Sequence, residues 1–338
     1  MRLNWAYFVC AALLAVGITS CSESEEPVDE SNDLTLDELI EKYPDSVSFL
    51  VKRGTEALNS YQYELAMSDA AKAFRLDSNN LQVKELYADV LNTRPDRTVE
   101  QVYIAQRHYK ELLQQIPESP SVLVGLAATF KQQQDFEESF KYINEALRID
   151  PRYRDAYVLK GSIYKILGQP DLMKSSYETA VQQDPEFFEG YTALGIIYQS
   201  ENNPLCIEYF TTAYQLQPEN LEAKYSMAYA KQHYGQLEEA KSVYREMATD
   251  TIDFYVSQAL FQLAHIKQFV DGDIDSAMYF YHSAIMTEPR FVEAHHNMGI
   301  CYDLKGNKTE ALKSFGQALK HNPEFELSRQ YADSIRFL

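Results

Sequence analysis

Beyond about residue 46, the pattern of apolar and polar positions predicts helices throughout the chain. Large apolar residues recur there at separations of three, four and seven, which places one apolar stripe on each successive helix. Glycines stand between these stretches, where a turn needs a positive φ or a helix has to stop: Gly168, Gly235, Gly272 and Gly306. The body is therefore predicted to be all-α, with short amphipathic helices joined by tight turns.

The same pattern repeats with a nearly constant period. Each unit closes on a proline, and these prolines are Pro117, Pro151, Pro185, Pro218, Pro289 and Pro323. The gaps between them are 34, 34, 33, 71 and 34 residues, and we interpret the gap of 71 as two units that lack a proline near Ile252 and hold three extra residues. A fixed period of this length predicts a solenoid, in which each unit packs on its neighbours.

Within each unit the spacing resembles that of the tetratricopeptide repeat. The last unit shows it as His295, Met298-Gly299, Tyr302, Ala311, Phe315, Ala318 and Pro323. The resemblance implies a right-handed superhelical solenoid of about eight helix pairs over residues 46–325. Residues 326–338 are predicted to form a helix that caps its last apolar face. The boundaries of two irregular units, at 81–119 and 221–257, stay open.

The N-terminal residues follow a different pattern. Arg2 precedes an apolar run from Trp5 to Ile18, which is too short for a membrane-spanning helix and predicts a signal peptide over residues 1–20. The run ends in Ile18-Thr19-Ser20-Cys21, which resembles the bacterial lipobox. The resemblance implies that Cys21 carries a diacylglycerol and becomes the mature N-terminus. Ordinary secretion with an incidental cysteine is the alternative.

Residues 21–45 are predicted to be an acidic, disordered tether, because the stretch from Ser22 to Asp33 has almost nothing to bury. This stretch resembles the signal that follows the lipidated cysteine in surface-exported lipoproteins of the Bacteroidota. We therefore expect a lipid-anchored protein of the bacterial outer membrane, at the cell surface more than on the periplasmic face. Lipoproteins that face the periplasm also have acidic tethers, so the second placement stays open.

Charge and cysteine content narrow the classes of partner. The chain has 31 Lys and Arg against 50 Asp and Glu, a formal net charge of −19, which argues against a nucleic-acid partner. Cys206 and Cys301 fall on helix-packing positions without a neighbouring cysteine, and we expect buried thiols there.

The resemblance also implies that the first helix of each pair lines a concave face, the usual place for a bound peptide. The best known version grips a terminal carboxylate with Lys and Asn, but the matching positions here begin with Val124 and Ala128 and contain no such clamp. Toward the C-terminal half this row becomes aromatic and apolar: Tyr225, Tyr229, His233, Ile266, Phe269 and Ile300. We expect it to accept an apolar or amphipathic segment of a partner, unless some of these residues pack between repeats.

Two sequence features suggest metal sites, and neither fits one. The run from Asp271 to Asp275 has alternating carboxylates, but a calcium loop needs a glutamate at its twelfth position, where His282 stands. Adjacent histidines such as His295 and His296 point in different directions on a helix. No catalytic or cofactor fingerprint is present. We therefore expect neither a metal site, nor a cofactor, nor an enzyme.

These observations favour a non-enzymatic scaffold or adaptor that binds other envelope proteins or peptide segments. The alternative is a surface lipoprotein that captures glycans or nutrients. Glycan binders built from such repeats add long insertions with aromatic platforms. This chain has no long insertion, and its only tryptophan, Trp5, lies in the predicted signal peptide.

Overall fold

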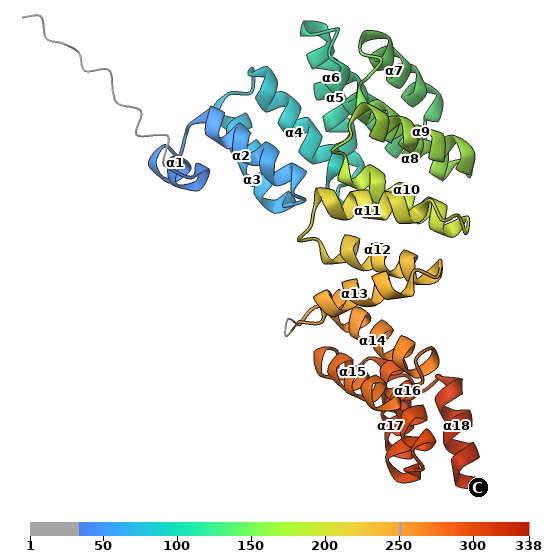
Figure 1. Cartoon of the computed structure of the whole chain (residues 1–338). Helices are drawn as coiled ribbons and strands as arrows, with labels where there is room; N and C mark the ends of the chain where they lie inside the picture. Colours follow the sequence, from blue (N-terminus) through green and yellow to red (C-terminus); the bar gives the residue numbers. More distant parts are fainter. Residues whose placement is uncertain (1–33, 250–251, 338) are drawn as a thin grey trace, which may run out of the picture. The chain divides into compact units, whose positions relative to one another are not determined.

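The computed structural model of the chain describes residues 34–249 and 252–337 (Figure 1). These residues form 18 α-helices joined by short turns, without a strand among them. None of these helices is both long enough and apolar enough to cross a membrane. The predicted signal peptide, Cys21 and the stretch from Ser22 to Asp33 lie outside the described residues. The chain divides into two compact units, one ending at Arg94 and the other beginning at Pro95.

The first unit contains four helices: α1 (Leu36–Lys42), α2 (Val47–Asn59), α3 (Tyr63–Leu76) and α4 (Leu81–Thr93). Helices α2 and α3 form the first helix pair. Its interior is built from small side chains, with Ala66, Ala70 and Ala73 inaccessible to solvent. These small residues allow the two helices to approach each other closely.

Helix α1 corrects the predicted extent of the tether, because residues 36–42 are helical and not disordered. Thr35 and Glu38 form a capping box, in which each side chain accepts a hydrogen bond from the other residue's backbone N–H. Ile40 is buried beside Leu50 and Val83. A cap followed by one apolar side chain with a place in the core is enough to order this short segment.

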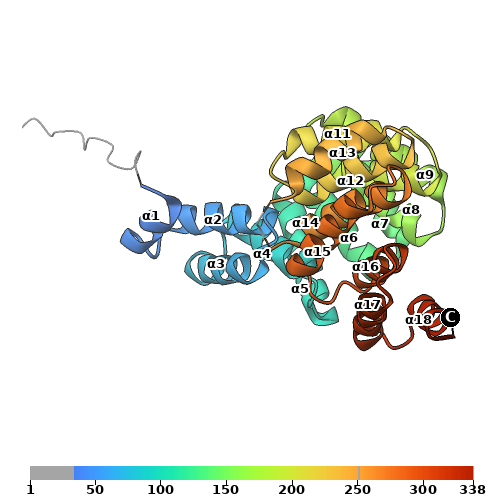
Figure 2. The same cartoon turned by 60° about the horizontal axis from the view of Figure 1, so that its bottom comes forward.

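The second unit contains the remaining helices, which run through α5 (Val99–Gln115), α6 (Pro120–Gln132), α7 (Phe136–Ile149), α8 (Arg154–Ile166), α9 (Pro170–Gln183), α10 (Phe188–Ser200), α11 (Cys206–Leu216), α12 (Leu221–His233), α13 (Leu237–Met247), α14 (Phe254–Phe269), α15 (Ile274–Thr287), α16 (Val292–Leu304), α17 (Lys308–His321) and α18 (Glu326–Phe337). From α6 onward, even- and odd-numbered helices pair in order, and the pairs follow one another through this unit (Figures 1 and 2).

The predicted fold class is confirmed. In the described chain seven helix pairs form, α2–α3 in the first unit and α6–α7 to α16–α17 in the second, and α18 follows as the cap. The irregular unit at 81–119 corresponds to α4 and α5, and the chain divides into its two compact units between them. The extra residues around Pro95 therefore lie at this division.

In two of these pairs, α16–α17 and α10–α11, a glycine packs closely against a ring. A Cβ atom added at Gly299 on α16 would lie 2.6 Å from the Phe315 ring of α17, and one added at Gly195 would lie 2.5 Å from the Phe210 ring. Both rings are buried. Because a side chain at either glycine would meet a ring below van der Waals distance, only glycine allows this approach.

The capping helix α18 covers the end of the last pair. Its Ala332 and Ile335 join the buried cluster that contains Phe315. The Nδ1 atom of His296 on α16 lies 2.9 Å from the hydroxyl oxygen of Ser328 on α18, and both side chains are buried. A polar contact inside an apolar cluster gives α18 one defined register on the helices beneath it.

Candidate partner-binding surface

The register of α14 decides which of its residues face outward. Ala264 is fully buried against Tyr281 of α15, as Gly299 is against Phe315 in the next pair. Helix α14 ends at its C-cap Val270, three residues before Asp273, the N-cap of α15. After α16 the C-cap Lys305 lies only two residues before Asn307, the N-cap of α17. The turn after α14 therefore contains one additional residue.

This extra residue makes the prediction for Ile266 wrong. The usual repeat spacing before Pro289 would place Ile266 among the residues expected to face a bound partner. In the structure its side chain is 2% exposed and packs in a core cluster with Ala228 and Leu263. A shift of one residue turns a helix by about 100°, which exchanges an inward position for an outward one. Phe261, His265 and Phe269 occupy the partly or fully accessible positions of α14 instead.

A cluster of tyrosines lies between α12, α13 and α14. Tyr225 is at its centre, with ring centroids 6.0 Å from Tyr229, 5.9 Å from Tyr255 and 6.0 Å from Tyr244. Tyr244 is completely buried, whereas Tyr225 and Tyr255 are half-buried and Tyr229 is 37% exposed. We call the accessible part, formed by Tyr225, Tyr229 and Tyr255, the tyrosine surface.

A chain of hydrogen bonds links the buried Tyr244 to Tyr225 at the centre of this cluster. The Tyr244 hydroxyl donates to Gln232 Oε1 at 2.8 Å, and Gln232 Nε2 donates to Gln262 Oε1 at 3.0 Å. Gln262 Nε2 in turn donates to the Tyr225 hydroxyl at 3.4 Å. Burial raises the pKa of Tyr225 to about 12, so its hydroxyl stays neutral at physiological pH. Groups from three helices thus hold Tyr225, the central ring of the cluster, in place.

The remaining predicted residues fall into two groups. His233 is exposed on α12, with its Nε2 atom 3.1 Å from Asn202 Oδ1, and Phe269 is 55% exposed with its ring 4.5 Å from that of His265. Ile300 is half-buried and packs against the cluster that joins α17 to α18. Tyr225, Tyr229, His233, Phe269 and Ile300 are therefore accessible in whole or in part, whereas Ile266 is buried.

Sequence reasoning missed Tyr255 and His265 as surface residues. Tyr255 lies in the first turn of α14. Asp253 caps this helix, because its side chain accepts a hydrogen bond from the Tyr255 N–H at 2.7 Å. The aspartate followed by two aromatic residues was a usable signal for a helix start. No signal in the sequence marked the extra residue of the following turn, on which the position of His265 depends.

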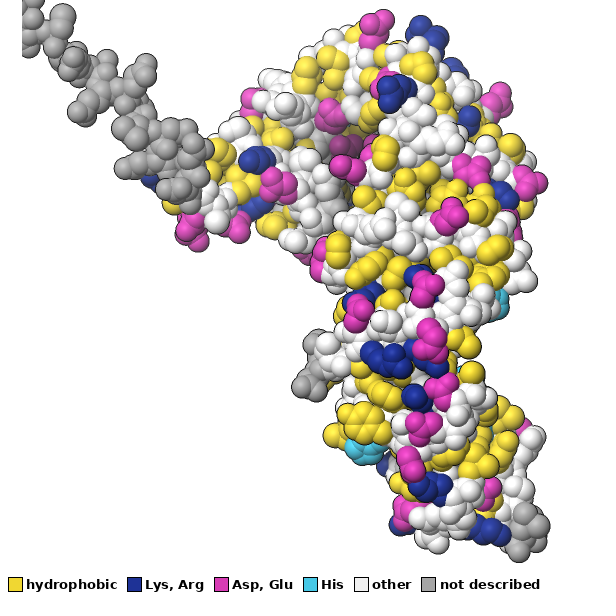
Figure 3. Space-filling model, in the orientation of Figure 1, with side chains coloured by type: hydrophobic (Ala, Val, Ile, Leu, Met, Phe, Trp, Pro, Cys, Tyr) yellow, Lys and Arg dark blue, Asp and Glu magenta, His cyan; other side chains and the backbone are white. Residues whose placement is uncertain are grey.

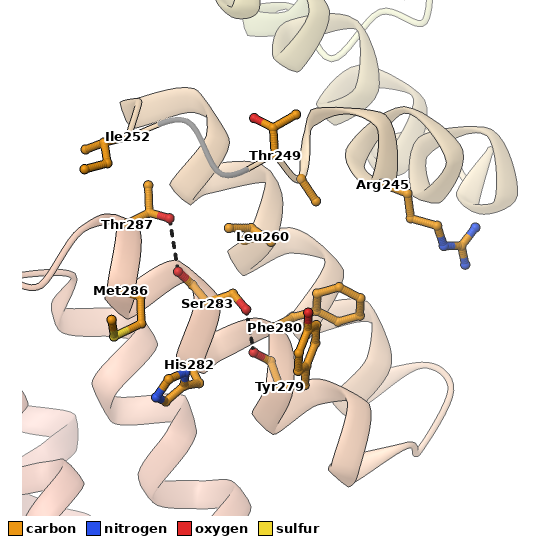
Figure 4. Close-up of a pocket in the computed structure, with 11 residues that line it drawn as sticks. Arg245, Thr249, Ile252, Leu260, Tyr279, Phe280, His282, Ser283, Met286 and Thr287 are labelled. Atoms are coloured by element: carbon orange, nitrogen blue, oxygen red, sulfur yellow. Dashed lines mark hydrogen bonds between the residues drawn. The ribbon is translucent and has the colours of Figure 1, made fainter.

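The same unit contains a cavity of about 410 Å³ between α13, α14 and α15 (Figure 4). Leu260, Phe280 and Met286 supply apolar walls. Ser283 and Thr287 also line it, but their hydroxyls donate to carbonyl oxygens of their own helix at 3.0 and 3.1 Å. Arg245, Tyr279 and His282 line it as well, so the cavity presents polar and apolar groups together.

The acidic run after α14 has structural roles in the described part of the chain. Asp271 forms ion pairs with Lys241 at 2.8 Å and Lys267 at 3.0 Å, and these partners hold the pKa of its carboxyl below the usual range. Asp273 caps α15 by accepting a hydrogen bond from the Ser276 N–H at 3.1 Å. Among the described residues, no three His, Cys, Asp or Glu side chains are grouped so that they could hold a metal ion.

Comparison with known proteins agrees with this architecture. Models of the tetratricopeptide repeat match residues 120–153, 155–187 and 292–325. These segments correspond to α6–α7, α8–α9 and α16–α17. They are tetratricopeptide repeats, a class of helix pair that binds peptide or protein partners in scaffolds that are typically non-catalytic.

Individual relatives are distant. The C-terminal part of a tetratricopeptide repeat protein from Cytophaga hutchinsonii is 17% identical, covers 73% of this chain and 98% of its own length, and has a TM-score of 0.58, which shows the shared fold. Anaphase-promoting complex subunit 3 of Schizosaccharomyces pombe is 24% identical over 51% of this chain. Human tetratricopeptide repeat protein 6 is 24% identical over 57% of it. The matches span only 25% and 37% of these two relatives.

Proposed function

We propose that this chain is a non-enzymatic scaffold that binds another protein of the bacterial cell envelope. The observation that carries the proposal is the tyrosine surface, where a hydrogen-bond network from three helices holds Tyr225 and the rings of Tyr229 and Tyr255 lie against it. Tyrosine supplies a large, amphipathic contact area at little cost in side-chain entropy. Rings that are already ordered before binding reduce that cost further, because fewer rotamers have to be frozen.

The sequence supports placing this scaffold at a membrane. We infer that Cys21 carries a lipid, that the acidic stretch from Ser22 to Asp33 links it to α1, and that the protein belongs to the outer membrane with its solenoid at the cell surface. A partner bound at the tyrosine surface would then be held within the length of this linker from the membrane. Capture of a glycan or nutrient is the second candidate, and the accessible aromatic rings are what favours it.

The binding proposal predicts that Tyr229→Ala reduces the recovery of specific envelope proteins on the purified chain by about tenfold, because truncating a central interface tyrosine costs on the order of 1–2 kcal/mol. The measurement is quantitative mass spectrometry of proteins captured from solubilised envelopes. Tyr103→Ala is the control, since Tyr103 on α5 is at least as accessible as Tyr229. Unchanged capture by Tyr229→Ala, or retention of polysaccharide in place of protein, would contradict the proposal.

The anchor proposal predicts that Cys21→Ala abolishes incorporation of radiolabelled palmitate and releases the protein from the membrane fraction. A single residue carries the thioether, and several acyl chains there are needed for stable anchoring. Cys206→Ala and Cys301→Ala serve as controls, because both thiols are buried. Label that survives Cys21→Ala would show that the lipid, if present, is elsewhere.

A further inference from the structure

The tyrosine surface has ring faces that no cation of the described chain covers, although this chain uses such contacts elsewhere. Lys174 lies over the Tyr198 ring at 5.3 Å, and Lys224 lies over the Tyr214 ring at 5.6 Å. No lysine or arginine among residues 34–249 and 252–337 is placed in this way over the rings of the tyrosine surface, which are accessible on α12 and α14.

The cations nearest in sequence to these rings pair with other side chains. On α12, Lys224 forms an ion pair with Glu246 at 3.2 Å, and Lys231 forms one with Glu239 at 2.6 Å. Both lysine side chains are largely covered in these pairs. The ammonium groups of these two lysines are therefore paired with glutamates of α13, the second helix of the pair. Neither lysine places its charge over the tyrosine surface.

A carboxylate borders the same rings. Glu222 is exposed in the first turn of α12, one helical turn before Tyr225. It also lies beside the Tyr255 hydroxyl of α14, where burial and then the nearby carboxylate raise the pKa of Tyr255. Within the described chain, no lysine, arginine or histidine forms an ion pair with Glu222, so its charge is not neutralised internally.

We propose that the tyrosine surface takes a basic segment of the partner, with one lysine or arginine cation over the Tyr229 ring and a second beside the Glu222 carboxylate, two helical turns away on α12. This inference rests on the proposed function and names the chemistry of the bound segment. A cation over a ring face is attracted by the negative face of the π-system, and a carboxylate binds a second cation through a charge-assisted hydrogen bond. The apolar residues of the segment would contact Phe269 and the half-buried Tyr225.

The overall charge favours the same class of partner. With a formal net charge of −19, the chain attracts basic segments at long range and repels acidic ones. On the face shown in Figure 3, apolar and charged side chains lie interleaved over the second unit. At the tyrosine surface itself, Tyr225 and the exposed Phe269 suit the apolar residues of an amphipathic segment. The bound segment is therefore a basic, amphipathic one.

The inference can be tested by fluorescence anisotropy with three labelled helical peptides that share a leucine stripe and carry Lys, Gln or Glu on the polar face. The protein is the chain from residue 21 with Cys21→Ala, which retains every described residue. We expect the Lys peptide to bind at least tenfold more tightly than the Glu peptide. Tyr229→Ala and Glu222→Gln should each weaken it by about three- to tenfold, while Tyr229→Phe, which keeps the ring, should not.

Glu293→Gln separates a local site from attraction by net charge. Glu293 is exposed in the first turn of α16, as Glu222 is on α12, but it lies on a helix without the tyrosine cluster. Equal losses for Glu222→Gln and Glu293→Gln would overturn the inference. Glu or Gln peptides that bind as tightly as the Lys peptide, and depend on Tyr229, would overturn it and leave the proposed function intact. If all three peptides bind and Tyr229→Ala does not weaken the binding of any of them, both this inference and the proposed function are contradicted.

Discussion

Single residues in this protein fall into sharply different packing environments even when they share a residue type. In the last helix pair, Gly299 on α16 faces the Phe315 ring, so that an added Cβ would lie 2.6 Å from it. A Cβ atom at Gly316 on α17 would have no atom within 4 Å apart from those of its chain neighbours and the backbone of its own helix. The first glycine is required for the close approach of two helices, whereas the second only weakens its own helix.

This difference predicts opposite effects of the same substitution. Gly299→Ala should lower the free energy of unfolding by about 1–3 kcal/mol, because the ring or the backbone has to move. Gly316→Ala should raise it by about 0.5–1 kcal/mol, because alanine is the better helix former and narrows the unfolded ensemble. Urea denaturation followed by circular dichroism measures both. Equal shifts in the same direction would show that packing against Phe315 does not decide the effect.

At the same scale, the candidate surface was only partly predictable from the sequence. The register of α12 follows from residues of the repeat pattern, which is why Tyr225, Tyr229 and His233 could be selected as candidates, although the sequence left open whether they are accessible or packed between repeats. Ile266 could not be placed, because a single extra residue in the turn after α14 leaves the spacing from Gly272 to Pro289 unchanged. Only the packing of α14 in the structure shows where that residue is inserted, because the sequence contains no local signal for it.

Among the helices, the two at the ends of the described chain differ most from the repeats. Helix α1 was predicted as tether because acidic residues surround it, yet one capping box and the burial of Ile40 order it. Helix α18 was predicted correctly, since an amphipathic segment after the last repeat has an apolar face to cover. Its one buried polar contact, from His296 to Ser328, could not be read from the sequence.

That contact predicts a pH dependence of stability. Burial lowers the pKa of His296 below its ordinary value of 6.5, so the unfolded chain binds a proton more readily than the folded one. The contribution of neutral His296 to the free energy of unfolding is therefore complete above about pH 6.5, and it is lost as the pH falls toward the pKa of His296 in the folded protein. We expect α18 to lose protection from hydrogen exchange between pH 7.5 and 5.5.

His296→Gln, which can still bond Ser328 but cannot take up a proton, should remove much of this dependence. The pKa values of His265 and His321 are lowered by burial too, so a smaller pH dependence should remain. An equally steep pH dependence in the His296→Gln variant would show that the contact between α16 and α18 does not sense pH.

For the whole molecule, repeat architecture was predictable because period and packing residues recur many times over, so that a single irregular unit does not hide them. What the chain binds was not predictable in the same way, since the contact surface depends on the turn lengths of two neighbouring repeats. The proposal combines a binding surface on α12 and α14 with a lipid anchor at Cys21. Together these would recruit a basic, amphipathic segment of an envelope protein to a membrane.

Site-specific photo-crosslinking in living cells tests this most directly. A photoreactive amino acid at position 233, where His233 is exposed beside the tyrosine surface, should give one discrete adduct with an envelope protein. The same amino acid at position 103 on α5 should not give that adduct, and Tyr229→Ala in the first protein should remove it. The account is contradicted if position 233 gives no adduct, or if both positions give the same ones.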